Sequence, residues 1–200
     1  RPAMAHASRG RPLPFQRVAM LAMPLLLGAC AHTTATLEPG PQVPVCSPAA
    51  SALILWAPVW RPDQKDAASR EAAAALGLDH FFAQPGCFAS TELRRVADLT
   101  PQSITAALAS PPPGVTRVVG IEVHELGPVV KLLSSMALVE GGTEVVLRIA
   151  EYAPRSGAEL RGFQVHWRHG GAGVIQGVVS LPLDMQAALR AGLKPDAAAQ

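Results

Sequence analysis

The sequence predicts an α+β fold, a mixed sheet of four to six strands with about three helices mainly on one face. Two observations carry this prediction. Apolar segments with strand character are separated by helical patterns in the first half of the chain, and two alternating segments around a tight turn form a hairpin in the second half. At 200 residues, the chain is long enough for one domain, which we place at residues 51–194.

The first 29 residues read as a leader. A segment with Arg9, Arg11 and Arg17 precedes the apolar run Val18 to Leu27, and small residues follow it. A basic region, a short apolar run and small residues before a cut are typical of a secretory signal. The run is too short for a transmembrane helix, which needs about 20 apolar residues. Met4 is the expected start of translation.

Leu27-Gly28-Ala29-Cys30 resembles the lipobox of bacterial lipoproteins. The resemblance implies a signal peptide at residues 1–29 that is cut before Cys30. It also implies that Cys30 carries diacylglycerol and palmitate and anchors the chain to a membrane. Ala31 at the second mature position resembles the outer-membrane sorting pattern, so we expect a cell-envelope protein on the periplasmic face of the outer membrane.

Net charge argues against a nucleic-acid partner. Four arginines precede Cys30, so the 17 basic residues fall to 13 against 15 acidic ones, a net charge of −2 after cleavage. A nucleic-acid-binding chain carries a clustered basic patch, and this sequence has no cluster of Lys or Arg.

Cys46 and Cys87 are the two cysteines that remain. Export to an oxidising compartment favours a disulfide between them. The alternative is two separate thiols, with Cys87 buried as a small apolar residue. Residues 30–50 are rich in proline and threonine and predict a flexible tether after the lipidated cysteine, so this disulfide would staple the tether to the domain.

Two strands and two helices are expected in the first half of the domain. The apolar run Ser51 to Trp56 predicts a strand covered on both faces, and Phe88 to Val96 predicts an exposed one. Asp63 to Leu76 predicts a helix that ends at Gly77, with an Asp66–Arg70 ion pair in its first turn. Thr100 as cap and Pro101 at the first helical position begin a second helix.

The second half predicts further strands and a closing helix. Val115 to Leu126 is a strand, Val129 to Leu138 fits either a helix or a strand, and Val174 to Val179 adds a short strand. Thr143 to Tyr152 and Glu159 to Arg168 form the hairpin around Pro154-Arg155-Ser156-Gly157. A last helix runs from about Pro182 to Ala191, and residues 195–200 form a disordered tail.

The hairpin and closing helix resemble the small α+β domains of periplasmic auxiliary lipoproteins of envelope transporters. The resemblance covers the strand, turn, strand and helix, and it implies no functional residue.

Metal-ligating and catalytic patterns are sparse. His124 and His166 both lie on predicted strands, and Glu122 shares the parity of His124, so a metal site would form if the two strands were neighbours in register. The alternative is two hydrogen-bonded histidines on a half-exposed face. Gly170-Gly171-Ala172-Gly173 lacks the following helix of a phosphate-binding loop and predicts a flexible loop.

These observations favour a non-catalytic binding or scaffolding module of the cell envelope, with a membrane anchor at Cys30 and an envelope protein as partner. No catalytic residue and no cofactor is assigned. The alternatives are a metal-assisted envelope hydrolase that uses His124 and His166, and a carrier of a small ligand.

Overall fold

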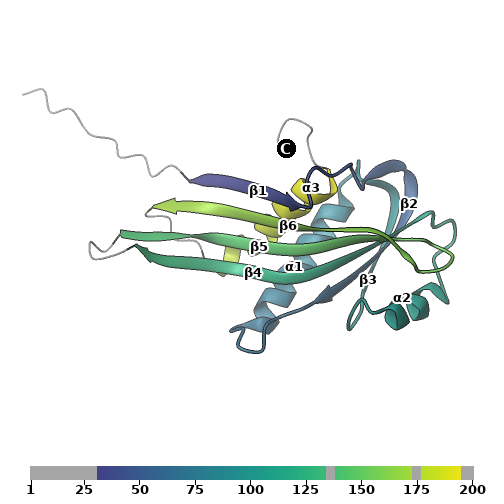
Figure 1. Ribbon diagram of the computed structural model, residues 1–200, viewed down its shortest axis with the longest axis horizontal. Coiled ribbons are helices and arrows are strands. Elements are labelled where there is room, and N and C mark those ends of the chain that lie inside the picture. Colours follow the sequence, from purple (N-terminus) through teal and green to yellow (C-terminus); the bar gives the residue numbers. More distant parts are fainter. Residues whose placement is uncertain (1–30, 134–137, 173–176, 195–200) are drawn as a thin grey trace, which may run out of the picture.

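A computed structural model describes residues 31–133, 138–172 and 177–194. Within them the chain forms one six-stranded sheet, three α-helices and a short 3-10 helix, η2 (Figure 1). The strands are β1 His32–Glu38, β2 Ser47–Pro58, β3 Phe88–Arg95, β4 Arg117–Leu133, β5 Leu138–Tyr152 and β6 Glu159–Ala172. The helices are α1 Ala67–Ala83, α2 Pro101–Leu108, η2 Val178–Ser180 and α3 Leu181–Leu193.

The sheet is mixed, as the sequence predicts. Its strand order is β1-β6-β5-β4-β2-β3. β2 is parallel to both β3 and β4, whereas β4, β5, β6 and β1 are each antiparallel to the next. The expected α+β fold is therefore confirmed: α1 and α2 lie in the connections between the parallel strands, β4, β5 and β6 are consecutive antiparallel strands, and β1 pairs with β6 from far away in the sequence.

The main core lies between the sheet and helices α1 and α3. One face of the hairpin strands contributes alternating apolar side chains, among them Ile149 from β5 and Val165 from β6, and both are fully buried. Met185 and Leu189 of α3 are fully buried against this layer, as the helical spacing predicts. Burial of this apolar surface is the main stabilising term of the fold.

A second, smaller core lies on the opposite face under α2. Leu53 and Leu55 of β2 point to this side, where they pack with Ile104 of α2, while Ile54 between them belongs to the main core. β2 is thus buried on both faces, which explains its continuous apolar run. Thr100 caps α2 as predicted, because its side-chain oxygen accepts a hydrogen bond from the amide of Ser103 at 3.3 Å.

The tether prediction for residues 30–50 is wrong in part. His32–Glu38 forms β1, which pairs with β6 along its whole length, from His32 opposite Gly170 to Glu38 opposite Gln164. Nearly every β1 side chain is exposed, so the strand has no apolar alternation to reveal it. Backbone hydrogen bonds to β6, together with the β-branched Thr33, Thr34 and Thr36, hold it in the sheet.

Helix α1 begins later and ends later than expected. It starts at Ala67, with Asp66 in the left-handed conformation (φ 57°) and no side-chain cap, and it continues past Gly77 to Ala83. Gly77 does not end the helix because it lies inside the contact with α3, where a Cβ would come within 2.6 Å of the Cβ of Met185. Arg70 contacts Glu125 rather than Asp66, so the predicted ion pair is also wrong.

Three segments in the second half of the chain, whose structure the sequence left open or predicted, lie only partly within the described residues or outside them. Val129 to Leu133 continue β4, which makes this part of the ambiguous segment a strand, and residues 134–137 lie outside the described residues. Val174 to Val179 was expected to be a strand, but Val178–Ser180 forms η2 and 173–176 lie outside the described residues. The tail at 195–200 lies outside them as well.

The glycines expected to form a loop are largely a strand. Gly170, Gly171 and Ala172 belong to β6, where Gly170 lies opposite Gly142 of β5. A Cβ on Gly142 would come within 2.4 Å of the carbonyl oxygen of His169, and one on Gly170 within 2.3 Å of the carbonyl of Gly141. Glycine lets the two backbones approach each other at this point of the sheet.

Candidate functional site: the N-terminal clasp and the polar sheet face

The structure contains the Cys46–Cys87 disulfide that the sequence predicts. Cys46 immediately precedes β2 and Cys87 immediately precedes β3, the strand parallel to β2, and Ser47 lies opposite Phe88. The two Cα atoms are 4.5 Å apart, within the range that a disulfide spans. Cys87 is 2% exposed, so the bond is shielded from solvent at its β3 side.

The segment before the disulfide is held by the last turn of α3. The backbone amides of Val45 and Cys46 donate to the carbonyl oxygen of Leu193 at 3.0 and 3.1 Å. Val45 is fully buried, and it packs in the main core. The carbonyls at a helix C-terminus lack intrahelical partners, and this one is satisfied by the chain that leads from β1 into β2.

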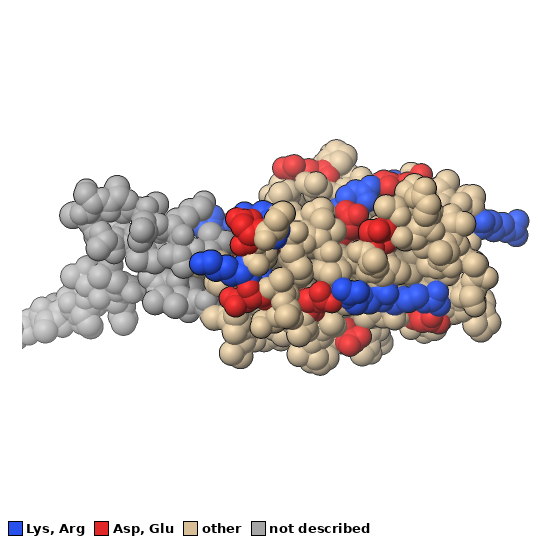
Figure 2. Space-filling model, turned by 90° about the horizontal axis from the view of Figure 1, so that it is seen from below, with Lys and Arg blue, Asp and Glu red and all other residues tan. Residues whose placement is uncertain are grey.

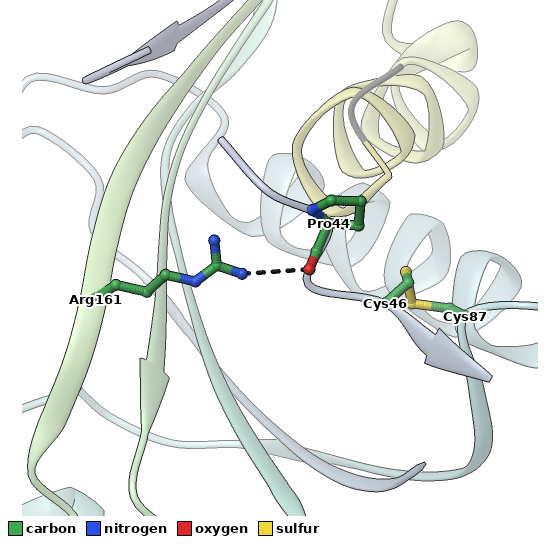
Figure 3. The surroundings of a disulfide bond; sticks show 4 residues. All are labelled: Pro44, Cys46, Cys87 and Arg161. Atoms are coloured by element: carbon green, nitrogen blue, oxygen red, sulfur yellow. Dashed lines mark hydrogen bonds between the residues drawn. A yellow bond between two sulfur atoms is a disulfide. The ribbon is translucent and has the colours of Figure 1, made fainter. Parts of the chain in front are cut away.

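Arg161 of β6 forms hydrogen bonds from the sheet to the same segment before the disulfide (Figure 3). Its guanidinium donates to the carbonyl oxygens of Val43 at 3.0 Å and Pro44 at 3.4 Å. It also contacts the buried carboxylate of Glu151, which Arg117 of β4 contacts from its other side at 2.8 Å. We call the disulfide, the Leu193 hydrogen bonds and the Arg161 contacts the N-terminal clasp.

The face of the sheet opposite α1 and α3 carries an ion-pair network beside α2. Arg148 of β5 forms a two-point contact with Glu159 at 2.7 and 2.8 Å and lies 4.0 Å from Glu122 of β4. Glu122 in turn contacts the ring of His124 at 3.1 Å. The hydrogen bond to Glu159 raises the pKa of Arg148, so this side chain stays cationic.

Tyr152 borders this network on β5. It is 5% exposed, lies in the smaller core under α2, and its hydroxyl interacts with Arg148. Burial raises the pKa of Tyr152 above its ordinary value of 10.0, because the phenolate would lose its hydration. Gly120 leaves room for the ring, since a Cβ there would come within 2.7 Å of it.

The two histidines do not form a shared site. β5 lies between the strands of His124 and His166, so the neighbouring register required for a metal site does not occur. His124 contacts Glu122, and His166 contacts the side chain of Gln164 at 3.2 Å. Among the described residues, no three His, Cys, Asp or Glu side chains are grouped to hold a metal ion. Both histidines are hydrogen-bonded and partly exposed, which is the alternative reading of the sequence.

A second polar cluster joins α1 to β4. Arg70 of α1 donates to the carboxylate of Glu125 at 2.8 Å and to the carbonyl oxygen of Leu126 at 2.7 Å. Gln64 and Arg61 reach the same carboxylate at 3.1 and 3.3 Å. The β4–β5 register shifts between Val123 and Glu125, and Val123 is also the last residue of β4 that pairs with β2, so Arg70 contacts β4 just beyond the end of that pairing. The cluster fixes α1 on the sheet.

An open groove lies at the end of the sheet near the β5–β6 turn. It has a volume of about 720 Å³, and residues 111–116 and 153–155 line it. Pro111, Pro112 and Pro113 give its lining a rigid apolar part, and Arg155 contributes a positive charge. Its described lining contains no Asp, Glu or His side chain.

Charge is mixed on the face of the molecule shown in Figure 2. Figure 2 shows Lys and Arg beside Asp and Glu along the molecule, with no extended patch of one sign on the face that it presents. A field of this kind steers no strongly charged polymer toward that face.

The clasp contains both residues that the sequence predicted and residues that it did not. The disulfide could be predicted from cysteine number and compartment, whereas Arg161, Glu151 and Arg117 gave no signal. These three side chains lie on the same face of neighbouring strands, which can be recognised only once the order β4-β5-β6 is known.

The predicted lipidation site, Cys30, lies outside the described residues. No helix in the described ranges is both long and apolar enough to cross a membrane.

Comparisons with known proteins find only distant likenesses. No family model matches the sequence, and a search of curated proteins finds no match. Among solved structures, the PelC dodecamer from Paraburkholderia phytofirmans is 13% identical, with 79% of this chain and 95% of that chain covered and a TM-score of 0.40. The lipoprotein GNA1162 from Neisseria meningitidis is 18% identical, with coverage of 70% and 96% and a TM-score of 0.34. A DUF330 protein from Xanthomonas campestris is 9% identical, with coverage of 76% and 82% and a TM-score of 0.37. Likenesses at this level assign neither a family nor a function.

Proposed function

We propose that this chain is a lipid-anchored lipoprotein of the cell envelope whose domain is a non-catalytic binding or scaffolding module. One observation carries the proposal. The lipobox-like Leu27-Gly28-Ala29-Cys30 ends two residues before His32, where the folded domain begins. Cleavage before Cys30 would therefore leave a mature chain that starts at the domain itself, with a thiol for diacylglycerol and a new amino group for palmitate.

The disulfide supports an exported chain. Structural disulfides persist in oxidising compartments and are rare in the cytosol. Cys46 and Cys87 connect the starts of two neighbouring strands, so their bond belongs to the domain's architecture. The periplasm would keep this bond oxidised, and Ala31 supports sorting to the periplasmic face of the outer membrane.

The polar chemistry of the domain supports binding over catalysis. Glu122, Arg148 and Glu159 are satisfied by one another, and His124 and His166 each have a neighbouring side chain as partner. A general acid or base exchanges a proton with a substrate, whereas these groups are engaged with one another within the domain. The partly exposed sheet face is instead suited to contact an envelope protein, as an auxiliary subunit of a transport or assembly complex does.

The anchor is tested with Cys30→Ser in the full-length chain. The variant should remain an uncut, unacylated precursor, while the parent chain yields a shorter acylated protein in the membrane fraction. Gel mobility and fractionation after metabolic labelling with a fatty acid measure both results. A Cys30→Ser variant that is still processed and acylated would refute the anchor.

The binding role is tested by photo-crosslinking in cells. A photoreactive amino acid replaces the exposed Gln164 on the polar sheet face, and a control places it at the exposed Asp79 on the outer side of α1. We expect one specific envelope protein to be linked from position 164 and not from position 79. Equal products from both positions, or none from either, would contradict a docking role for this face.

A further inference from the structure

We infer that the outer edge of β1 pairs with β1 of a second copy of this chain, antiparallel and centred on Ala35. In the described part of the chain, β1 pairs with β6 alone and forms one edge of the sheet (Figure 1). The inference goes beyond the proposed function. It does not depend on the lipid anchor either, because the pairing uses no residue before His32.

The backbone of β1 presents a regular row of polar groups along this edge. In an antiparallel strand, every second residue turns its amide and its carbonyl toward one neighbour, and the residues between turn theirs to the other side. β1 pairs with β6 over all seven of its residues without a register shift, so its outer side is equally regular. Such a row of donors and acceptors is a template for another strand.

The two edges of the sheet differ in their protection against such pairing. Edge strands that stay unpaired usually carry charged residues, proline or a bulge. The other edge, β3, carries Glu92, Arg94 and Arg95. The guanidinium of Arg94 also donates to the carbonyl oxygen of Ala107 at 3.1 Å, which ties this strand to the end of α2. β1 has no lysine, arginine or proline, and its one carboxylate belongs to its last residue, Glu38.

β1 is complementary to itself in one antiparallel register. Pairing the whole strand in both copies places Ala35 opposite Ala35 and His32 opposite Glu38. Opposite residues then have the same parity, so the edge-facing backbone groups of one copy meet those of the other. Thr34 lies opposite Thr36 in this register. An imidazole that faces a carboxylate and a threonine that faces a threonine are both favourable cross-strand pairs.

Symmetry favours a second copy over another strand as the occupant of this edge. A two-fold contact uses the same surface on both copies, so each favourable pair occurs twice. A register shifted by two residues would leave the ends of both strands unpaired and would remove the contact between His32 and Glu38. In the full register the two six-stranded sheets join into one continuous sheet.

Disulfide trapping measures this register. The full-length chain with Ala35→Cys is expressed in bacteria, and the isolated membranes are treated with a mild oxidant. Opposite residues of antiparallel strands have Cα atoms about 4.5–5.5 Å apart, which a disulfide spans. We expect most of the protein to migrate as a covalent dimer that a thiol reductant abolishes.

Thr33→Cys is the matched control. Thr33 shares a face of β1 with Ala35, but in the proposed register the two Thr33 positions are displaced by four residues, about 13 Å. This variant should give no more dimer than the parent chain, which also controls for the thiol of Cys30. Equal dimer at positions 33 and 35, or no dimer from a folded Ala35→Cys variant, would overturn the inference.

A double variant keeps the test decisive if Ala35→Cys does not fold. His32→Cys and Glu38→Cys replace two exposed residues that lie about 20 Å apart along one strand, too far to bond within a chain. In the proposed register they form bonds between two copies. Either single substitution should give only the parent's amount of dimer, and a double variant that gives no more than the single ones refutes the pairing.

Sedimentation equilibrium of the full-length chain in detergent tests the pairing without a covalent bond. His32→Glu places two carboxylates opposite each other at both ends of the paired strands and should weaken dimerisation by roughly tenfold. His32→Lys keeps opposite charges there and should dimerise as the parent does. Equal dimerisation of all three chains would contradict the register. If position 35 is linked in membranes to a different protein, the edge belongs to that protein and the second copy is refuted.

Discussion

Single side chains on β6 differ sharply in what they contribute to stability. Phe163, Val165 and Trp167 are buried against the helices, whereas Gln164 and His166 lie on the other face and are exposed or partly exposed. This alternation could be predicted from the sequence, because a strand with one buried face places every second side chain in the core.

Trp167→Ala should destabilise the domain far more than His166→Ala. Trp167 is 5% exposed, so its truncation should lower the free energy of unfolding by roughly 3–5 kcal/mol. His166→Ala should lower it by under about 1 kcal/mol, since it removes one half-exposed hydrogen bond. Urea unfolding of both variants measures the difference, and the reverse order would mean that the faces of β6 are swapped.

Asp98 gives a pH-dependent contribution at the start of α2. Its carboxylate accepts hydrogen bonds from the hydroxyl groups of Ser103 and Thr100 and from the Thr100 amide, and these lower the pKa of Asp98 below its ordinary value of 3.8. A lowered folded-state pKa stabilises the fold above 3.8, and this contribution is lost as pH falls through the folded-state value.

Asp98→Asn should therefore lower the melting temperature at pH 7, and the gap from the parent chain should narrow below about pH 4. Calorimetry across this range tests it, with Asp79→Asn on α1 as the control for loss of an exposed carboxylate. A gap that stays constant with pH would assign the effect of the substitution to something other than the charge of Asp98.

At the scale of elements, the contact between α1 and α3 depends on one glycine. A Cβ at Gly77 would come within 2.6 Å of the Met185 Cβ and 2.9 Å of the Pro182 carbonyl oxygen. The first of these atoms is next to the backbone and the second belongs to it, so neither can move aside alone. The two helices would have to separate or tilt.

Gly77→Ala should lower the free energy of unfolding by roughly 1–3 kcal/mol, although alanine is the better helix former. Gly177→Ala is the control, because a Cβ there meets no atom within 4 Å, and it should change stability by less than about 0.5 kcal/mol. Thermal melts of the two variants decide this, and a stabilised Gly77→Ala would contradict the close helix contact.

Elements with an apolar pattern could be predicted, and those held by backbone pairing could not. The alternation of apolar and polar residues in β5 and β6 and the Thr100 cap of α2 are local sequence patterns, and the structure confirms them. β1 has exposed side chains and only its pairing with β6 makes it a strand, so residues 30–50 resembled a tether. Gly77 resembled a helix stop because glycine often follows the end of a helix. The contact that explains it is with α3, a segment about 100 residues away, and the local sequence does not reveal it.

The same division applies to the candidate site. The number of cysteines was enough to predict the Cys46–Cys87 disulfide. Whether His124 and His166 could share a metal site depended on strand order, and β5 lies between their strands. Arg161 reaches the carbonyl oxygens of Val43 and Pro44 across more than 110 positions of sequence. No periodicity encodes a contact between a strand side chain and a distant backbone group.

At the scale of the whole molecule, the N-terminal clasp, which includes the disulfide, holds residues 43–46 to α3, β3 and β6. Replacing both Cys46 and Cys87 by alanine should lower the free energy of unfolding by up to about 4 kcal/mol, because the bond closes a loop with a sequence separation of 41. Denaturation of the oxidised parent and the double variant measures this. An unchanged midpoint would mean that the Leu193 and Arg161 contacts alone hold the segment.

The most direct test of the central claim is the mass of the N-terminal peptide of the protein extracted from bacterial membranes. We predict a peptide that begins at Cys30 and carries diacylglycerol on the thiol and palmitate on the amino group. An N-terminal peptide that begins upstream of Cys30, or one in which Cys30 is unmodified, would contradict the lipid anchor.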